Sequence, residues 1–140
     1  MCGRFTQRLS SAEFAELFGA TDLAGTPGEA YNVAPTQQVL AVRDREEGRT
    51  LERLRWGFVP SWSTGPDPRG RMINARAETV ATSPAFRASF RSKRCLVPVD
   101  GFYEWRRDEG RSRPFYIASA DGSPLASSSV MALRRRTAPP

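Results

Sequence analysis

Histidine is absent from the 140 residues of this chain, lysine occurs once, at Lys93, and there are only two cysteines. Without histidine, these residues cannot form a histidine-containing catalytic triad or a histidine-ligated metal site. The two cysteines, Cys2 and Cys95, are too few for a disulfide scaffold, and a reducing compartment would keep both as thiols. We therefore predict no metal and no cofactor, and any catalysis must rely on other side chains.

Long hydrophobic runs are also missing. No segment approaches the roughly 18 apolar residues that a membrane span requires, and the first residues contain no apolar segment of signal-peptide length. A cytoplasmic protein without a membrane partner is expected. The hydrophobic share of 39% and the charged share of 26% are ordinary for a folded domain, and the length suits a single core. We expect a monomer.

Positive charge is in excess and comes almost wholly from arginine. The 21 basic residues outnumber 15 acidic ones, which gives a net charge of +6. Three of these charges lie in the run Arg134–Arg136, so that +3 remains for the rest of the chain (6 minus 3). This excess favours an anionic partner such as nucleic acid, but a solvated arginine-rich surface would explain it equally well.

Local patterns predict short helices among several strands. A capping box over Ser10–Glu13 and a stop at Gly19 predict a helix over 11–18, and Ser83 followed by Pro84 predicts the start of a second helix that carries Phe86 and Phe90. The other expected elements are loops at 20–30 and 63–70, a hairpin of strands 39–42 and 51–59 around a turn at 46–48, strands at 95–105 and 114–118, and turns at 107–112 and 121–122. From residue 125 on we find no strand or helix pattern, so a tail is expected there.

Cys2 is the residue with the most reactive potential. A small residue after the initiator favours removal of Met1, which would give Cys2 a free α-amine beside its thiol. Such groups titrate at about pH 8 and about pH 8.5, so both have a reactive fraction near neutral pH. The amine could capture an aldehyde as a Schiff base, and the thiolate could then close a five-membered thiazolidine ring. A chance Met-Cys start is the simpler alternative.

Glu104 is a candidate general acid or base. In the expected strand 95–105 it shares a face with Phe102, and a carboxylate beside apolar groups suits proton transfer. The simpler interpretation is an exposed glutamate paired with Arg106 or Arg76. Cys95, in the same strand, is expected to be a small buried hydrophobic residue.

The polar stretch around Asn74 and Arg76 and the tryptophans Trp56 and Trp62 are candidates for a DNA site. An amide and a guanidinium close in sequence could orient a sugar and a phosphate. Indole rings could stack on unpaired bases, although aromatic residues of strands more often belong to the core.

Five segments with distinct motifs follow one another along the chain. They are Met1–Phe5 (MCGRF), Tyr31–Pro35 (YNVAP), Leu54–Trp62 (LRWGFVPSW), Asn74–Thr79 (NARAET) and Arg94–Trp105 (RCLVPVDGFYEW). Together they resemble the SOS-response-associated peptidase (SRAP) family of abasic-site processing proteins, over residues 1 to about 124. The resemblance implies a β-rich α+β fold with short flanking helices and a basic groove that holds single-stranded DNA. It also implies a covalent link from the N-terminal cysteine to the ring-opened aldehyde of an abasic site.

Single residues receive roles from this resemblance. Cys2 would be the nucleophile, Asn74 would hold and polarise the sugar, and Glu104 would be the acid/base group. The implied DNA contacts are Arg4 and Arg76 to flanking phosphates, and Asn32, Pro35 and Trp56 along the groove. The implied partner is single-stranded DNA that contains abasic sites.

The sequence departs from the family pattern in its last part. Family members are longer and carry a late His-Asp-Arg-Met-Pro-like motif, whose histidine assists ring opening and reversal of the adduct. We therefore expect residues 1–124 to be the N-terminal part of an SRAP-like domain, and 125–140 to be an unmatched, disordered tail after a truncation or frameshift. Such a fold would be incomplete, with an open sheet edge and low stability.

Two alternatives belong to other functional classes. A cysteine peptidase would use Cys2 to cleave itself or other chains, with Glu104 or its own amine as the base. A non-catalytic basic module, or a degenerate fragment, would bind nucleic acid only through its arginines. Replacement of Cys2 separates these alternatives, because covalent capture needs the thiol and electrostatic binding does not.

Overall fold

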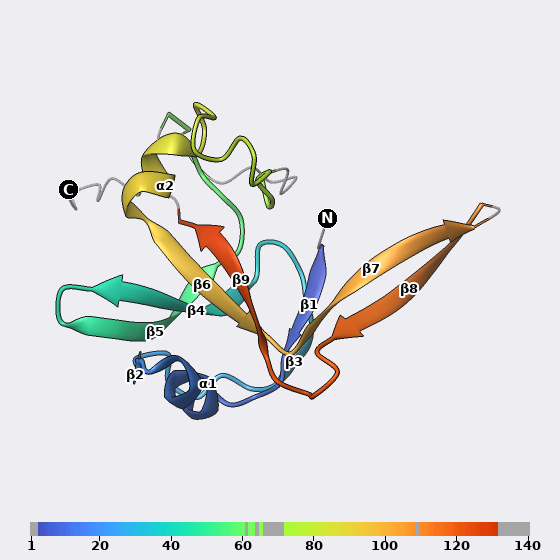
Figure 1. Cartoon of the computed structure of the whole chain (residues 1–140), viewed down its shortest axis with the longest axis horizontal. Coiled ribbons are helices and arrows are strands. Elements are labelled where there is room, and N and C mark those ends of the chain that lie inside the picture. Colours follow the sequence, from blue (N-terminus) through green and yellow to red (C-terminus); the bar gives the residue numbers. More distant parts are fainter. Residues whose placement is uncertain (1–2, 61, 64, 66–71, 109, 132–140) are drawn as a thin grey trace.

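Two β-sheets and two short helices make up the computed structural model of the chain, which describes residues 3–60, 62–63, 65, 72–108 and 110–131 (Figure 1). The first sheet has the order β3 (Ala30–Val33), β1 (Arg4–Gln7), β7 (Gly101–Asp108), β8 (Arg111–Ala118). The second has the order β2 (Thr21–Asp22), β5 (Gly48–Arg55), β4 (Gln38–Arg45), β6 (Arg94–Val99), β9 (Leu125–Val130). The helices are α1 (Ser11–Phe18) and α2 (Arg87–Ser92). The predicted β-rich α+β class is confirmed.

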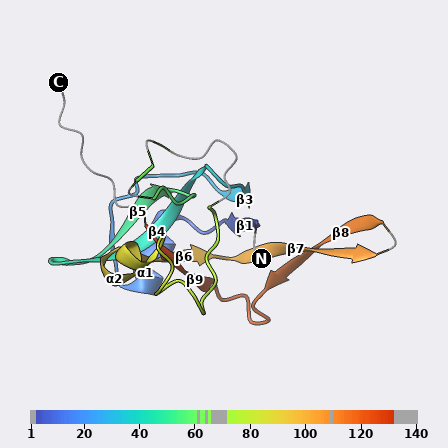
Figure 2. The same ribbon diagram turned by 90° about the horizontal axis from the view of Figure 1, so that it is seen from above.

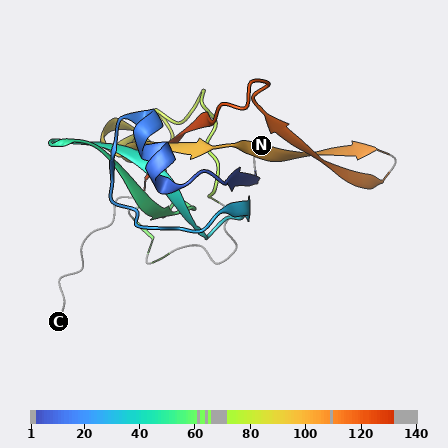
Figure 3. The same cartoon turned by 90° about the horizontal axis from the view of Figure 1, so that it is seen from below.

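Helix α1 has the bounds that its capping residues predict. Ser10 Oγ accepts a hydrogen bond from the Glu13 backbone N–H at 3.2 Å, and the Glu13 carboxylate accepts one from the Ser10 N–H at 2.8 Å. Gly19 ends the helix in the left-handed conformation, with φ of 58°. The buried Phe14 packs with Leu40 and Leu51, so α1 covers one face of β4 and β5 (Figure 3).

The predicted hairpin is confirmed as β4 and β5. The two strands pair from Gln38 opposite Arg55 to Arg45 opposite Gly48, with the turn at residues 46–47. The second strand ends at Arg55, four residues earlier than expected. The reason is that Trp56 leaves the sheet to bond with the loop before β4, where its N–H donates to the Gln37 carbonyl at 2.8 Å.

The expectation of one strand over 95–105 is wrong, because β6 and β7 belong to different sheets. The chain changes sheet at Asp100, whose N–H donates to the Thr6 carbonyl at 3.0 Å and whose carboxylate accepts from the Arg8 N–H. The apolar alternation runs through Asp100 without interruption. The change of sheet therefore depends on tertiary hydrogen bonds to β1 and the residue after it, which no local pattern reveals.

The side chain of Gln7 is inserted between β4 and β6. Its Nε2 donates to the Leu40 carbonyl at 3.0 Å and to the Pro98 carbonyl at 2.7 Å, and its Oε1 accepts from the Leu40 N–H at 3.0 Å. Pro98 has no N–H to donate to a neighbouring strand. The buried amide of Gln7 thus takes the place of the missing ladder bond and ties β1 to the second sheet.

Two further expectations are corrected around the second helix and the first loop. Helix α2 begins at Arg87, not at Pro84, and no side chain caps it. Ser83 instead accepts the Arg87 N–H through its backbone carbonyl at 2.9 Å, in a turn that leads into the helix. The expected loop 20–30 contains the short strand β2, which pairs with β5. Most of the expected loop 63–70 lies outside the described residues.

The arm formed by β7 and β8 is longer than the sequence predicts. Residues 107–112 were expected to be a turn, but pairing continues to Asp108 opposite Arg111. The expected strand 114–118 is confirmed within β8. Every residue of β8 is exposed, and the arm extends away from the rest of the chain in both Figure 1 and Figure 2.

The expectation of a disordered segment from residue 125 is wrong for Leu125–Val130. These residues form β9, which pairs with β6 from Leu125 opposite Val99 to Val130 opposite Arg94. The turn at 121–122 that precedes it is confirmed, with Gly122 at φ of 77°. Residues 132–140 lie outside the described residues, and the division of the chain into domains stays a prediction.

Gly101 is required where β7 passes the aromatic ring of β8. A Cβ on Gly101 would lie 2.4 Å from Tyr116 Cζ and 2.7 Å from the Ile117 carbonyl oxygen. We expect Gly101→Ala to lower the free energy of unfolding by about 1–3 kcal/mol, because the overlap must displace the Tyr116 ring and its neighbouring backbone. Thermal unfolding measures this effect. Gly28→Ala is the control, since a Cβ there meets nothing within 4 Å, and an equal loss in both variants would contradict the prediction.

Candidate functional site

Polar residues from three strands meet at the start of β1. Arg4 Nη1 donates to Asn32 Oδ1 on β3 at 3.1 Å. On the other side of β1, Arg4 pairs with Tyr103 of β7, so that Glu104, the next residue of β7, lies beside the N-terminal end of β1. Strand pairing therefore places Arg4, Asn32 and Glu104, which are far apart in the sequence, at the same end of the first sheet, with the Arg4 and Asn32 side chains on one face and the Glu104 side chain on the other.

Trp56 connects this strand to two other predicted segments. Its ring lies 4.9 Å from the ring of Phe5, and its backbone carbonyl accepts the Thr36 N–H at 2.8 Å, beside Pro35. Its indole Nε1 donates to the Ile73 carbonyl at 3.2 Å, directly before Asn74. The half-buried Trp56 thus packs against the core and also holds the segments of Pro35 and Asn74 close to β1.

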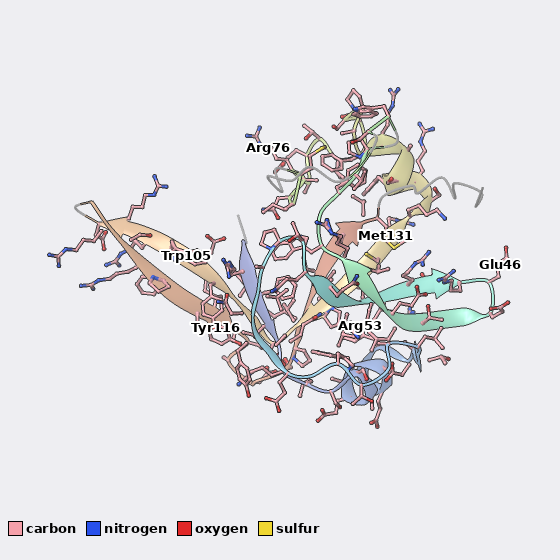
Figure 4. The ribbon with its side chains drawn as sticks, turned by 180° about the vertical axis from the view of Figure 1, so that it is seen from behind. Glu46, Arg53, Arg76, Trp105, Tyr116 and Met131 are labelled. Atoms are coloured by element: carbon pink, nitrogen blue, oxygen red, sulfur yellow. The ribbon has the colours of Figure 1, made fainter. Side chains whose placement is uncertain are left out.

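Asn74 and Arg76 lie on an exposed segment between Trp56 and α2. The Arg76 carbonyl accepts the N–H groups of Thr79 and Val80 at 3.1 and 2.9 Å, which starts a turn. The Arg76 side chain is directed away from both sheets (Figure 4). This position suits contact with a phosphate, and the role of each residue stays a prediction.

Of the two cysteines, only Cys95 lies among the described residues. Cys2 lies outside the described residues. Cys95 is 8% exposed, and burial raises the pKa of its thiol, against the opposing effects of Ser129 and Arg43. Cys95 is therefore the small buried residue that the sequence predicts, with little thiolate at neutral pH.

Phe115 is a neighbour of Glu104 that the sequence analysis missed. The two residues are directly opposed in the pairing of β7 and β8. Phe115 is 44% exposed, which is unusual for a phenylalanine side chain of a strand. Counting residues back from the turn around Gly110 along both strands of the hairpin would have predicted that Phe115 lies opposite Glu104.

The described part of the chain offers neither a membrane-spanning helix nor a cluster of metal ligands. None of its helices is long and apolar enough to cross a membrane. Among the same residues there is no group of three or more cysteine, aspartate or glutamate side chains that could hold a metal ion.

Known proteins match the chain over most of its length. The model of the family "SOS response associated peptidase (SRAP)" matches residues 1–138. The chain belongs to the SRAP family. The matched range continues past residue 124, where the motif resemblance ended, and includes β9.

Curated relatives of this SRAP chain share one name. It is 40% identical over 115 residues to the abasic site processing protein YoaM of Bacillus subtilis, covering 81% of this chain and 51% of the relative. It is 35% identical over 130 residues to the abasic site processing protein YedK of Escherichia coli, covering 89% and 57%. The chain thus spans about half the length of these relatives.

Solved structures agree with the fold. A phage-related protein from Bordetella bronchiseptica matches with a TM-score of 0.77 and 30% identity, covering 98% of this chain and 63% of that one. A protein from Bacteroides thetaiotaomicron matches with a TM-score of 0.78 and 22% identity, covering 91% and 58%. The second likeness concerns the fold alone.

Proposed function

We propose that this SRAP chain captures abasic sites in single-stranded DNA as a covalent thiazolidine adduct of Cys2. The position of Arg4, Asn32 and Glu104 on neighbouring strands at the N-terminal end of β1 carries the proposal, because Cys2 precedes Arg4 by only two residues in the sequence. The names of the relatives, abasic site processing proteins, point to the same lesion.

The proposed reaction condenses one aldehyde with one cysteine. The α-amine of Cys2, freed by removal of Met1, adds to the ring-opened sugar aldehyde, and the resulting carbinolamine loses water to give a Schiff base. The Cys2 sulfur then bonds to the same carbon, and the thiol proton passes to the nitrogen. The product is a thiazolidine, with one water released overall. Glu104 would donate and accept the protons in these steps, and Asn74 would hold the sugar.

The remaining predicted residues would bind the strand around the lesion. Arg4 and Arg76 would contact flanking phosphates, and Asn32, Pro35 and Trp56 would line the groove. The connections of Trp56 to Phe5, Thr36 and Ile73 support this arrangement, because they hold these segments in one neighbourhood. The partner would be single-stranded DNA, bound by a monomer in the cytoplasm or at the nucleoid.

Intact mass spectrometry tests the proposal. After incubation with an oligonucleotide that contains one abasic site, we expect the protein to lack Met1 and to gain the mass of the oligonucleotide less one water. The adduct should survive denaturation, because ring closure protects the Schiff base from hydrolysis.

An undamaged oligonucleotide of the same sequence is the control and should give no adduct. A chain that retains Met1 should give none either, since its cysteine nitrogen is then part of a peptide bond. Absence of any adduct with the abasic strand, while non-covalent binding persists, would favour the basic binding module. Turnover of peptide substrates without an adduct would favour the peptidase.

A further inference from the structure

The arm of β7 and β8 presents a second set of groups on the face that carries Glu104. Residues that alternate along a strand share a face, and directly paired residues of neighbouring strands share it too. We define the Glu104 face of the arm by three cross-strand pairs. They are Glu104 with Phe115, Arg106 with Arg113, and Asp108 with Arg111. This face starts beside β1 and continues outward along the arm (Figure 1).

An aromatic ring and a guanidinium are already stacked on this face. The Cζ atom of Arg106 lies 5.3 Å from the centroid of the Phe115 ring. Arg106 Nε donates to Asp108 Oδ2 at 2.6 Å, which orients the guanidinium. The Arg106 side chain is 61% exposed and Phe115 is 44% exposed, so both remain accessible to a partner.

The charges of the arm are poorly balanced for a hairpin on its own. Arg106 and Arg113 stand directly opposite one another, and like charges in this position destabilise a sheet. The Glu104 face carries three arginines and two acidic residues, a net charge of +1 (3 minus 2). An anion between the two opposed arginines would relieve their repulsion, and this favours a phosphate-bearing partner over an apolar one.

We propose that the Glu104 face of the arm binds single-stranded DNA next to the abasic site. Phe115 stacks on an unpaired base, and Arg106 and Arg113 contact the phosphates of the same strand. Aromatic rings between cations are the combination that holds single strands without sequence readout. The inference rests on the proposed function, since it assigns a path to the strand that leaves the site at Glu104.

The arm offers a matched control for each variant. Arg107, opposite Ser112, lies on the other face of the arm. Arg107→Ala therefore removes one positive charge, as Arg113→Ala does, but from the face that is not proposed to bind DNA. We expect Arg113→Ala to weaken the affinity for an undamaged single strand by about 5- to 10-fold, and Arg107→Ala by less than about 2-fold. Phe115→Ala should weaken it by about 5-fold or more, and Phe115→Tyr should retain it.

Fluorescence anisotropy with a labelled oligonucleotide over a range of salt concentrations measures these affinities. Loss of one phosphate contact should reduce the slope of log Kd against log salt by about 0.7 for Arg113→Ala, with no change for Arg107→Ala. Equal effects of the two arginine variants, or no effect of either, would overturn the proposal. So would failure of the parent chain to bind a single strand. Circular dichroism melting verifies that the exposed substitutions leave folding unchanged.

The outcome separates this inference from the proposed function. At saturating abasic DNA, the arm variants should still form the Cys2 adduct. If every variant forms the adduct and binds DNA with the affinity of the parent, the proposed role of the arm is wrong and covalent capture stands. If the arm variants bind DNA more weakly but the parent forms no adduct, covalent capture is wrong and the role of the arm stands. Gel filtration tests the alternative that this face binds a second copy of the chain. If the substitutions dissociate a dimer and leave DNA affinity unchanged, that alternative is correct and the proposal is wrong.

Discussion

Cys2→Ser is expected to abolish the denaturation-resistant adduct with abasic DNA. Serine keeps the α-amine, so a Schiff base can still form, but its hydroxyl is a far weaker nucleophile than a thiolate and does not close the ring. The remaining imine hydrolyses during denaturing electrophoresis. Loss of the band should therefore be complete at any incubation time, unless a reductant traps the imine.

Cys95→Ala is the matched control, because it removes the other thiol of the chain. Cys95 is buried and its pKa is raised, so the adduct should form in this variant as in the parent. Borohydride added to Cys2→Ser should restore a stable bond, which would show that the amine still reaches the aldehyde. An equally durable adduct in Cys2→Ser without reductant would refute thiazolidine formation.

Gln7→Leu is expected to destabilise the chain more than any surface substitution. The buried amide of Gln7 bonds to the N–H and the carbonyl of Leu40 and to the carbonyl of Pro98. A leucine side chain at position 7 makes none of these three hydrogen bonds. Each buried backbone group that loses its hydrogen bond costs about 1–3 kcal/mol. A loss of about 3 kcal/mol or more is a large part of the stability of an ordinary domain, which is about 5–15 kcal/mol. Urea unfolding followed by tryptophan fluorescence measures the change.

Gln38→Leu provides the comparison at an exposed position on β4. It should change the free energy of unfolding by less than about 0.5 kcal/mol, because no buried bond is lost. If Gln7→Leu unfolds at the same urea concentration as the parent, the amide is not what joins the two sheets.

Sequence patterns predict the elements that local chemistry determines. Helix α1 follows from the reciprocal bonds of Ser10 and Glu13, and the hairpin of β4 and β5 follows from two apolar strands around a short turn. Strand β9 could not be found in this way. Its central residues, Ser127 to Ser129, carry no apolar alternation, because this edge strand depends on backbone pairing with β6 more than on burial.

The residues of the candidate site could be predicted from the sequence, but their arrangement in space could not. The motifs single out Arg4, Asn32 and Glu104, but their meeting depends on which strands neighbour β1. The sequence could not supply that order, because the chain changes sheet at Asp100 through hydrogen bonds to Thr6 and Arg8. Phe115 was missed because its place opposite Glu104 depends on the exact length of the β7–β8 turn.

The free edge of β8 also has a consequence for solubility. Phe115, Tyr116 and Ile117 are each between 41% and 45% exposed on a strand whose outer side pairs with no other strand among the described residues, a template for strand addition between molecules. Pro114 interrupts that edge because it has no N–H to offer, and the arginines beside it repel an approaching copy. These residues therefore act as gatekeepers against aggregation. Shielding of their charge, by salt or by a bound polyanion, would remove part of that protection.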